Sequence, residues 1–207
     1  MNKTIRILIA DDHAVVRMGL GALLGAEPDM EVVGEAKNGH EAVALAPELK
    51  PDVIIMDLMM PKKDGIQASA ELHKVLPSSK IVILTSFGTS DDISHALVAG
   101  ASAALMKTAE NTELLKAIRT VITGRQYLST HVKNLFKNDP PIPELSPRQR
   151  EILDSISRGL TNEEIARQLG IGVASVKTHI LALFEKIGAA NRSEAATIAL
   201  RKHLLKI

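Results

Sequence analysis

The 207-residue sequence contains no cysteine, which excludes disulfide bridges and thiolate metal sites. Aromatic residues make up only 2% of the chain, so the core must be built from Leu, Ile, Val and Ala. No apolar run approaches the ~20 residues that a membrane-spanning helix needs. The first residues lead straight into an apolar run and leave no room for a signal peptide. These absences predict a cytoplasmic protein without a membrane segment.

The net charge of +1 hides an uneven distribution of charged residues. Residues 145–207 contain ten Lys or Arg against six Asp or Glu, a net charge of +4. Residues 1–144 contain fifteen Lys or Arg against eighteen Asp or Glu, a net charge of −3. The basic end of the chain favours contact with a polyanion, and the acidic start favours a separate role.

Four short apolar runs in the first half of the chain end on polar side chains. Such runs, bounded by breakers, are typical of buried strands in a parallel sheet. The runs at 5–10, 53–56, 80–84 and 103–106 are followed in order by Asp11 with Asp12, Asp57, Thr85 and Lys107. Because the carboxyl ends of parallel strands meet at one edge of the sheet, we expect these side chains to lie together there.

Helical periodicity between these runs predicts a doubly wound α/β domain over residues 1–124. Residues 30–36 add a fifth strand, and Gly124 ends the last of five helices. Ser90 is expected to cap the fourth helix, with acidic residues in its first turn where they suit the helix dipole. Five strands that alternate with five helices predict a five-stranded parallel sheet with helices on both faces.

The sequence after Gly124 changes character. Residues 125–144 show little periodicity and include the stiff run Asp139–Pro143, so we expect a linker with a short helix near 131–136. The remaining residues, 145–207, read as helices throughout.

The start signals of the last part predict a helix-turn-helix. Ser146–Gln149 and Thr161–Glu164 are capping boxes that each open a short helix. Gly170–Gly172 then forms a tight link into a longer helix over 173–187. Two helices joined by a tight glycine-containing turn have the geometry of a DNA-binding helix-turn-helix over residues 145–207.

The acids at the sheet edge suit phosphoryl chemistry. Asp11, Asp12 and Asp57 would form an all-oxygen pocket of the kind that holds Mg²⁺. With the metal bound, one carboxylate can attack a phosphoryl group, while Lys107 neutralises the oxygens and Thr85 donates a hydrogen bond. The alternative is that the acids cap helices and Lys107 forms a structural ion pair.

Residues 4–124 resemble the receiver domain of two-component response regulators. Asp11, Asp12, Asp57, Pro61, Gly65, Thr85 and Lys107 match the acid pair, phosphoacceptor, turn residues, switch hydroxyl and lysine of that domain. Residues 145–207 resemble the LuxR-type helix-turn-helix, with signatures at Leu145–Leu153 and Gly159–Ala166. The two in this order resemble the NarL/FixJ subfamily.

This resemblance implies a flavodoxin-like receiver and a transcription regulator controlled by phosphorylation. It implies that Asp57 accepts a phosphoryl group from a sensor histidine kinase and that Asp11, Asp12, Asp57 and the Met59 backbone carbonyl hold Mg²⁺. It further implies double-stranded DNA as the target, and a homodimer on phosphorylation or DNA binding. Ala104 and Thr108 depart from the usual aromatic and proline, so the common aromatic switch is absent.

The helix over 173–187 is the expected recognition helix. Val176, Ile180, Leu183 and Ile187 would form its buried stripe, which leaves Lys177, Thr178 and Leu181 to meet the major groove. Lys177 would contact guanine or phosphate, and the other two a thymine methyl. Arg192 is a candidate phosphate contact. The alternatives are an ordinary solvated face and a plain surface arginine.

The last helix, expected over Ser193–Leu204, has more apolar surface than docking on its own small domain requires. Its small residues permit close approach of a second helix. Packing within the domain and a two-fold dimer contact both explain this pattern.

Two other functions compete with a transcription regulator. One is a phosphohydrolase with an aspartyl-phosphate intermediate, but the position two after Asp57, where its general acid would stand, is Met59. The other is a binding module that is never phosphorylated, although the full acid, hydroxyl and lysine set speaks against it. Met59 and Phe87 are expected to flank the phosphoryl group and to slow its hydrolysis because neither orients a water.

Overall fold

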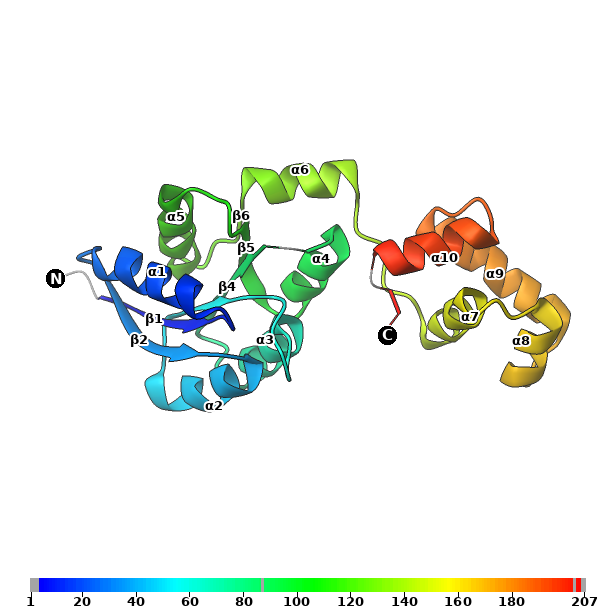
Figure 1. The fold of residues 1–207 in the computed structure, drawn as a ribbon, viewed down its shortest axis with the longest axis horizontal. Coiled ribbons are helices and arrows are strands. Elements are labelled where there is room, and N and C mark those ends of the chain that lie inside the picture. The colour runs from blue at the N-terminus through cyan, green and yellow to red at the C-terminus, as the bar shows by residue number, and fades with distance from the viewer. Residues whose placement is uncertain (1–3, 87, 203, 206–207) are drawn as a thin grey trace. The chain divides into compact units, whose positions relative to one another are not determined.

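The computed structural model describes residues 4–86, 88–202 and 204–205 (Figure 1). The chain separates into two compact units, Met1–Pro140 and Pro141–Ile207. The first unit mixes strands and helices, and the second contains helices, as the sequence predicts.

A parallel sheet forms the centre of the first unit. Its strands follow the order β2-β1-β3-β4-β5-β6, and each neighbouring pair is parallel. They are β1 (Ile5–Ala10), β2 (Met30–Ala36), β3 (Val53–Met56), β4 (Lys80–Thr85), β5 (Ala101–Met106) and β6 (Tyr127–Leu128). The predicted doubly wound sheet is confirmed, with β6 as an additional strand at its edge.

Helices cover both faces of the sheet (Figure 1). In β3, Val53 and Ile55 pack in one hydrophobic cluster while Ile54 and Met56 pack in the other. Burial on both faces explains why this strand is a continuous apolar run and not an alternating one. One face carries α1 (Ala14–Gly25) and α5 (Asn111–Ile122); the other carries α2 (Gly39–Leu49), α3 (Gly65–Val75) and α4 (Ser90–Val98).

The cap of α4 differs from the prediction. Thr89, and not Ser90, is the N-cap, and it forms a capping box with Asp92. The Thr89 hydroxyl accepts a hydrogen bond from the Asp92 backbone N–H at 3.1 Å, and the Asp92 carboxylate accepts one from the Thr89 N–H at 2.9 Å. Ser90 is fully buried in the first turn. The cap lies one residue earlier because Asp92 can reach back only to the residue three positions before it.

The segment expected as a linker is partly built into the first unit. Within residues 125–144, β6 pairs with β5 and is followed by α6 (Thr130–Asn138). The Ser129 backbone N–H donates to the Ala104 carbonyl at 3.1 Å, and Val132 is fully buried in the sheet's hydrophobic cluster. Burying a valine side chain contributes ~1.5–3 kcal/mol, and Leu128, Leu135 and Phe136 also pack against this cluster. Residues 139–146, all within the described part of the chain, form no helix or strand.

The second unit is a small helical domain with its own core. Both predicted capping boxes are present, Ser146 with Gln149 and Thr161 with Glu164. Gly170 ends α8 in the left-handed conformation with φ of +66°, which glycine adopts without strain. The helices are α7 (Pro147–Ser157), α8 (Asn162–Leu169), α9 (Val173–Ile187) and α10 (Arg192–Arg201).

The last helix is shorter than expected. α10 ends at Arg201, before the predicted end at Leu204. α9, with 15 residues, is the longest helix in the described part of the chain. None of the described helices has the length and apolar character needed to cross a bilayer.

Candidate functional site

The predicted side chains gather at the carboxyl edge of the sheet. Asp11 directly follows β1, Asp57 follows β3, Thr85 ends β4 and Lys107 follows β5. Asp11, Asp57 and Thr85 are buried, at 2%, 4% and 1% exposure. The main chain fixes their positions, because the Asp57 N–H donates to the Ala10 carbonyl and the Lys107 N–H donates to the Thr85 carbonyl, both at 2.8 Å.

The loop after Asp57 is held by a close contact with α3. A Cβ on Gly65 would lie 2.1 Å from the Asp57 carbonyl oxygen, so any other residue at this position would displace the loop that follows Asp57. The Gly65 N–H also donates to the Leu58 carbonyl at 2.8 Å. The turn glycine that the sequence pointed to is therefore required by packing next to the site.

Lys107 joins two of the acids. Its ammonium lies 2.6 Å from Asp11 Oδ2 and 2.8 Å from Asp57 Oδ2. The lysine side chain is itself only 12% exposed. One positive charge thus holds two carboxylates from separate strands at a fixed distance, out of bulk water, where the interaction is poorly screened.

Burial and charge act against each other in this pair. Burial raises the pKa of the Asp57 carboxyl above its usual value, and the hydrogen bond from Lys107 opposes the rise. For Lys107, burial alone lowers the pKa, but the hydrogen bonds and charges of Asp11 and Asp57 outweigh it and raise the pKa above 10.5. Lys107 therefore carries its positive charge at neutral pH.

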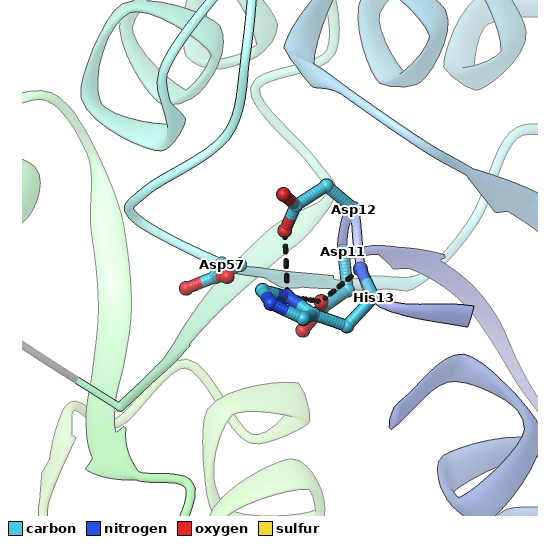
Figure 2. A group of neighbouring side chains, drawn as sticks. All are labelled: Asp11, Asp12, His13 and Asp57. Atoms are coloured by element: carbon cyan, nitrogen blue, oxygen red, sulfur yellow. Dashed lines mark hydrogen bonds and ion pairs between the residues drawn. The ribbon is translucent and has the colours of Figure 1, made fainter. Parts of the chain in front are cut away.

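Three carboxylates and an imidazole form a cluster of possible metal ligands at this edge. Asp11, Asp12, His13 and Asp57 each offer one ligand atom, and these atoms lie within 4.8 Å of one another (Figure 2). The oxygen donors fit the preference of Mg²⁺ for carboxylates. His13 was not among the predicted site residues. Its only sequence signal is its place directly after the acid pair.

Arg17 supports the acid pair from α1. Its guanidinium Nη1 donates to the Asp11 backbone carbonyl at 2.8 Å, and its Nε donates to Glu35 Oε2 at 3.0 Å. The side chain is buried, at 8% exposure, so α1 and β2 together fix the loop that carries the acids. The sequence alone gave no signal for this role.

Met59, two residues after Asp57, is 58% exposed, so much of its surface is open to solvent. Its backbone N–H lies 3.5 Å from Asp57 Oδ1, at the long limit for a hydrogen bond. Phe87, the other residue expected to flank the phosphoryl group, lies outside the described residues.

On α9 the predicted division of faces is present. Val176, Ile180, Leu183 and Ile187 are buried in the core of the second unit. Lys177, Thr178 and Leu181 are exposed, Leu181 at 70%. Leu181 therefore lies outside the core, on the same exposed side of α9 as Lys177 and Thr178, and its contact with DNA stays a prediction.

Arg192 makes a contact that the sequence did not indicate. Its guanidinium donates to the Leu160 backbone carbonyl, just before the N-cap of α8. The side chain is therefore used, at least in part, to tie α10 to the start of the helix-turn-helix. The use of its other donors on DNA remains a prediction.

Much of the apolar surface of α10 packs inside its own unit. Ala195, Ile198 and Ala199 are buried in the hydrophobic cluster of the second unit. Leu200 stays 60% exposed. The surface open to a dimer contact is thus narrower than the sequence suggested.

An α/β unit with buried acids and a lysine at its carboxyl edge, followed by a helix-turn-helix, is the architecture of a DNA-binding regulator with a receiver. Residues 7–119 match the response regulator receiver domain family, and residues 143–199 match the bacterial regulatory proteins of the luxR family. The chain belongs to the NarL/FixJ-type response regulators of two-component systems. Such regulators are not enzymes with turnover of a separate substrate, which sets the phosphohydrolase alternative aside.

Similar proteins match 95–98% of the chain. The transcriptional regulatory protein LiaR of Bacillus subtilis is 43% identical, over 97% of this chain and 99% of LiaR. The response regulator protein VraR of Staphylococcus aureus is 36% identical, over 98% and 100%. RcsB of Salmonella enterica, solved on promoter DNA with the phosphomimetic BeF3⁻, is 26% identical with a TM-score of 0.72, over 95% and 98%. Another structure holds two RcsB dimers bound to two parallel DNAs, with 26% identity and a TM-score of 0.72, over 97% and 99%.

Proposed function

We propose that Asp57 accepts a phosphoryl group from a sensor histidine kinase and that this event controls binding of the second unit to promoter DNA in the cytoplasm. The observation that supports this most directly is the bridge from Lys107 to both Asp11 and Asp57 at the buried sheet edge. A buried ion pair is a poor source of stability, because the cost of removing its charges from water offsets their attraction. The position of this ion pair at the carboxyl edge of the sheet is better explained by a role in phosphoryl transfer.

The positions of these side chains support the following transfer. An Asp57 carboxylate oxygen attacks phosphorus in line, an O–P bond forms, and the N–P bond to the kinase histidine breaks with its electron pair returning to the imidazole. Lys107 neutralises charge on the phosphoryl oxygens, and Thr85 donates its hydroxyl to one of them. Asp11, Asp12, Asp57 and the Met59 carbonyl would hold Mg²⁺, which supplies further neutralisation of those oxygens.

The second unit would read DNA through α9. Lys177, Thr178 and Leu181 share its exposed face, and Arg192 stands at the start of the following helix. The net charge of +4 over residues 145–207 favours a polyanion. RcsB, a structural relative, is bound to DNA as dimers, and we propose a homodimer here too.

Labelling with acetyl phosphate tests the proposal. With Mg²⁺, the wild-type protein should gain one phosphoryl group by intact mass, and its affinity for promoter DNA should rise. Asp57→Ala should lose both effects while keeping its circular dichroism spectrum. Asp64→Ala is a control, because Asp64 is a half-buried aspartate outside the acid cluster that caps α3 by accepting a hydrogen bond from the Gln67 N–H. Full labelling of Asp57→Ala would overturn the assignment.

A further inference from the structure

Gly39 is the first residue of α2, and the helix itself does not explain a glycine there. The N-cap is the preceding Asn38, whose side chain accepts a hydrogen bond from the Glu41 N–H at 3.0 Å. The φ angle of Gly39 lies outside the left-handed region that favours glycine. Glycine is also a poor helix former. Only a contact with another part of the chain makes a side chain unfavourable at this position.

That contact is with the far end of the loop that follows Asp57, residues 58–64, which we call the phosphoacceptor loop. The Gly39 N–H donates to the Lys63 carbonyl at 3.1 Å, so the loop satisfies a first-turn N–H that has no partner inside the helix. A Cβ on Gly39 would lie 2.6 Å from the Lys63 carbonyl oxygen and 3.0 Å from the Ala68 Cβ on α3. A backbone oxygen cannot rotate away as a flexible side chain can. Alanine at this position would therefore displace the loop.

The phosphoacceptor loop depends on such outside contacts for its shape. Lys62 has a φ of +69°, a left-handed conformation that costs a lysine free energy and persists only where the surrounding structure imposes it. At the start of the loop the Met59 N–H lies 3.5 Å from Asp57 Oδ1, which is too long to hold the chain firmly. The bond from Gly39 to the residue directly after Lys62 is shorter. The strained turn is thus held from α2 and not from the site itself.

Asp57 is held by a different part of the structure. Its backbone N–H donates to the Ala10 carbonyl within the sheet at 2.8 Å, and its carboxylate lies 2.8 Å from the Lys107 ammonium. A displaced phosphoacceptor loop would therefore move the Met59 carbonyl, which the proposed function assigns to Mg²⁺, more than the Asp57 carboxylate. The contact at Gly39 thus affects the metal, while the sheet positions the nucleophile.

We propose that Gly39 is a positioning residue for the phosphorylation site, because it holds the phosphoacceptor loop where the Met59 carbonyl reaches Mg²⁺. The inference rests on the proposed function for the contact between Met59 and the metal. Gly39 touches neither the metal nor the phosphoryl group, and it acts through Lys63 and the loop. A side chain at this position weakens Mg²⁺ binding and leaves the Asp57 nucleophile in place.

Labelling of the full-length protein with acetyl phosphate over a range of Mg²⁺ concentrations tests this inference. In Gly39→Ala the Mg²⁺ concentration that gives half the maximal rate should rise about tenfold or more, the scale for groups that support a metal ligand. The rate at saturating Mg²⁺ should stay close to that of the wild type, because Asp57 and Lys107 keep their places. Titration calorimetry of the unphosphorylated protein with Mg²⁺ should show the same loss of affinity.

The control separates positioning from a loss of stability. Gly19→Ala, at an exposed glycine within α1 whose added Cβ would meet nothing within 4 Å, should match the wild type. A lower stability of Gly39→Ala alone would reduce the folded fraction, and with it the labelling rate at every Mg²⁺ concentration, without moving the half-maximal point. Circular dichroism at the assay temperature measures that fraction.

A measurement on the wild type covers the case in which Gly39→Ala does not fold. If the Gly39 contact favours the metal, Mg²⁺ must strengthen that contact by the same factor. Exchange of the Gly39 amide hydrogen, followed by NMR, should therefore slow about tenfold when Mg²⁺ is saturating. Exchange at Gly188, whose N–H donates to the Glu185 carbonyl at the end of α9, should not change.

The outcomes separate the two proposals. An unchanged half-maximal Mg²⁺ concentration in folded Gly39→Ala, or an unchanged exchange rate of the Gly39 amide on Mg²⁺ binding, overturns the role of Gly39. Mg²⁺-dependent labelling of Asp57 would then leave the proposed function standing. Failure of the wild type to be labelled overturns the proposed function, while a lower Mg²⁺ affinity of Gly39→Ala by calorimetry still supports the positioning role.

Discussion

At the carboxyl edge of the sheet, two opposing effects act on the ionisation of the Asp57 carboxyl. Its side chain is 4% exposed, and that burial raises the pKa of the carboxyl, while Lys107 at 2.8 Å favours the ionised form. In the proposed transfer Asp57 attacks in its ionised form, which the hydrogen bond from Lys107 favours.

We predict slow self-dephosphorylation, because Met59 cannot orient an attacking water by hydrogen bonding. Met59→Asn supplies an amide beside Asp57, so phosphate should leave faster. The half-life of the phosphorylated protein, followed by phosphate release, measures this. Met59→Leu, which keeps an apolar side chain, should match the wild type. If Met59→Asn combined with Phe87→Ala loses phosphate no faster than the parent, the shielding interpretation is wrong.

A second residue-scale prediction concerns Lys177 on the exposed face of α9. Lys177→Ala should cost ~1–3 kcal/mol in binding to the operator alone if the lysine reads a base. If it contacts phosphate, affinity should fall equally on all sequences, and the slope of log K against log salt should shrink by about one. Binding isotherms at several salt concentrations distinguish these cases. Lys74→Ala, an exposed lysine on α3, serves as control; equal affinity and slope for both variants would place Lys177 outside the interface.

Among the elements, α5 is connected to the turn before β2 by a charged cluster. The Arg119 guanidinium binds Asp29 through Nε at 2.8 Å and Nη2 at 2.7 Å, and Nη2 also lies 2.6 Å from Glu27 Oε2. A bidentate arginine–carboxylate pair fixes the relative orientation of two elements more firmly than a single contact. This cluster has a definite pH dependence.

The hydrogen bond from Arg119 lowers the pKa of the Asp29 carboxyl below 3.8. Because the folded state holds this proton less tightly than the unfolded state, the pair stabilises the fold above pH 3.8 and loses its contribution as the pH falls through the lowered value. Arg119→Gln should therefore cost ~0.2–1 kcal/mol at neutral pH, the range for exposed pairs, and less in acid. Urea unfolding at a series of pH values measures the difference. Arg125→Gln, which loses a hydrogen bond to the nearby Thr123, is the control, and its effect on the free energy of unfolding should not decrease in acid. A cost for Arg119→Gln that is independent of pH would contradict the ion-pair explanation.

For the whole molecule, each unit has its own hydrophobic core, so each can fold around a separate set of buried residues. Under the proposed function, phosphorylation of the first unit controls DNA binding by α9, and we expect a change in association to connect the two. A homodimer is the simplest such change, since two-fold symmetry doubles the contact with DNA.

We predict that the phosphorylated protein dimerises and that Leu200 contributes to the contact. Leu200 is 60% exposed on a helix whose other apolar residues are largely buried. Burying a leucine contributes ~1.5–3 kcal/mol, so Leu200→Glu should weaken the dimer at least tenfold. Sedimentation of the phosphorylated protein measures the dissociation constant. Val75→Glu, at a comparably exposed position on α3, should leave it unchanged. Equal dimer strength in both variants would remove α10 from the interface.

Local signals were enough for much of this protein. The sheet strands β1 to β5 and the capping boxes at Ser146 and Thr161 were predicted because each depends on residues within one turn or one strand. The grouping of Asp57 with Lys107 also followed, since parallel strands always place their carboxyl ends at one edge. Such features are determined by the sequence itself, because period, breakers and caps act over short distances.

Other features depended on contacts between distant parts of the chain. The short helix near 131–136 was predicted and is present as α6, but β6 and the docking of this segment on the sheet depend on the Ala104 carbonyl and the buried Val132, and no local period signals a two-residue strand. The contact from Arg192 to the Leu160 carbonyl spans 32 residues. The loop that carries Asp11 is held by Arg17, whose guanidinium also binds Glu35 on β2, 18 residues away. The tertiary structure alone decided these, because the free energy that favours them comes from neighbours that become adjacent only when the sheet and the helical core have formed.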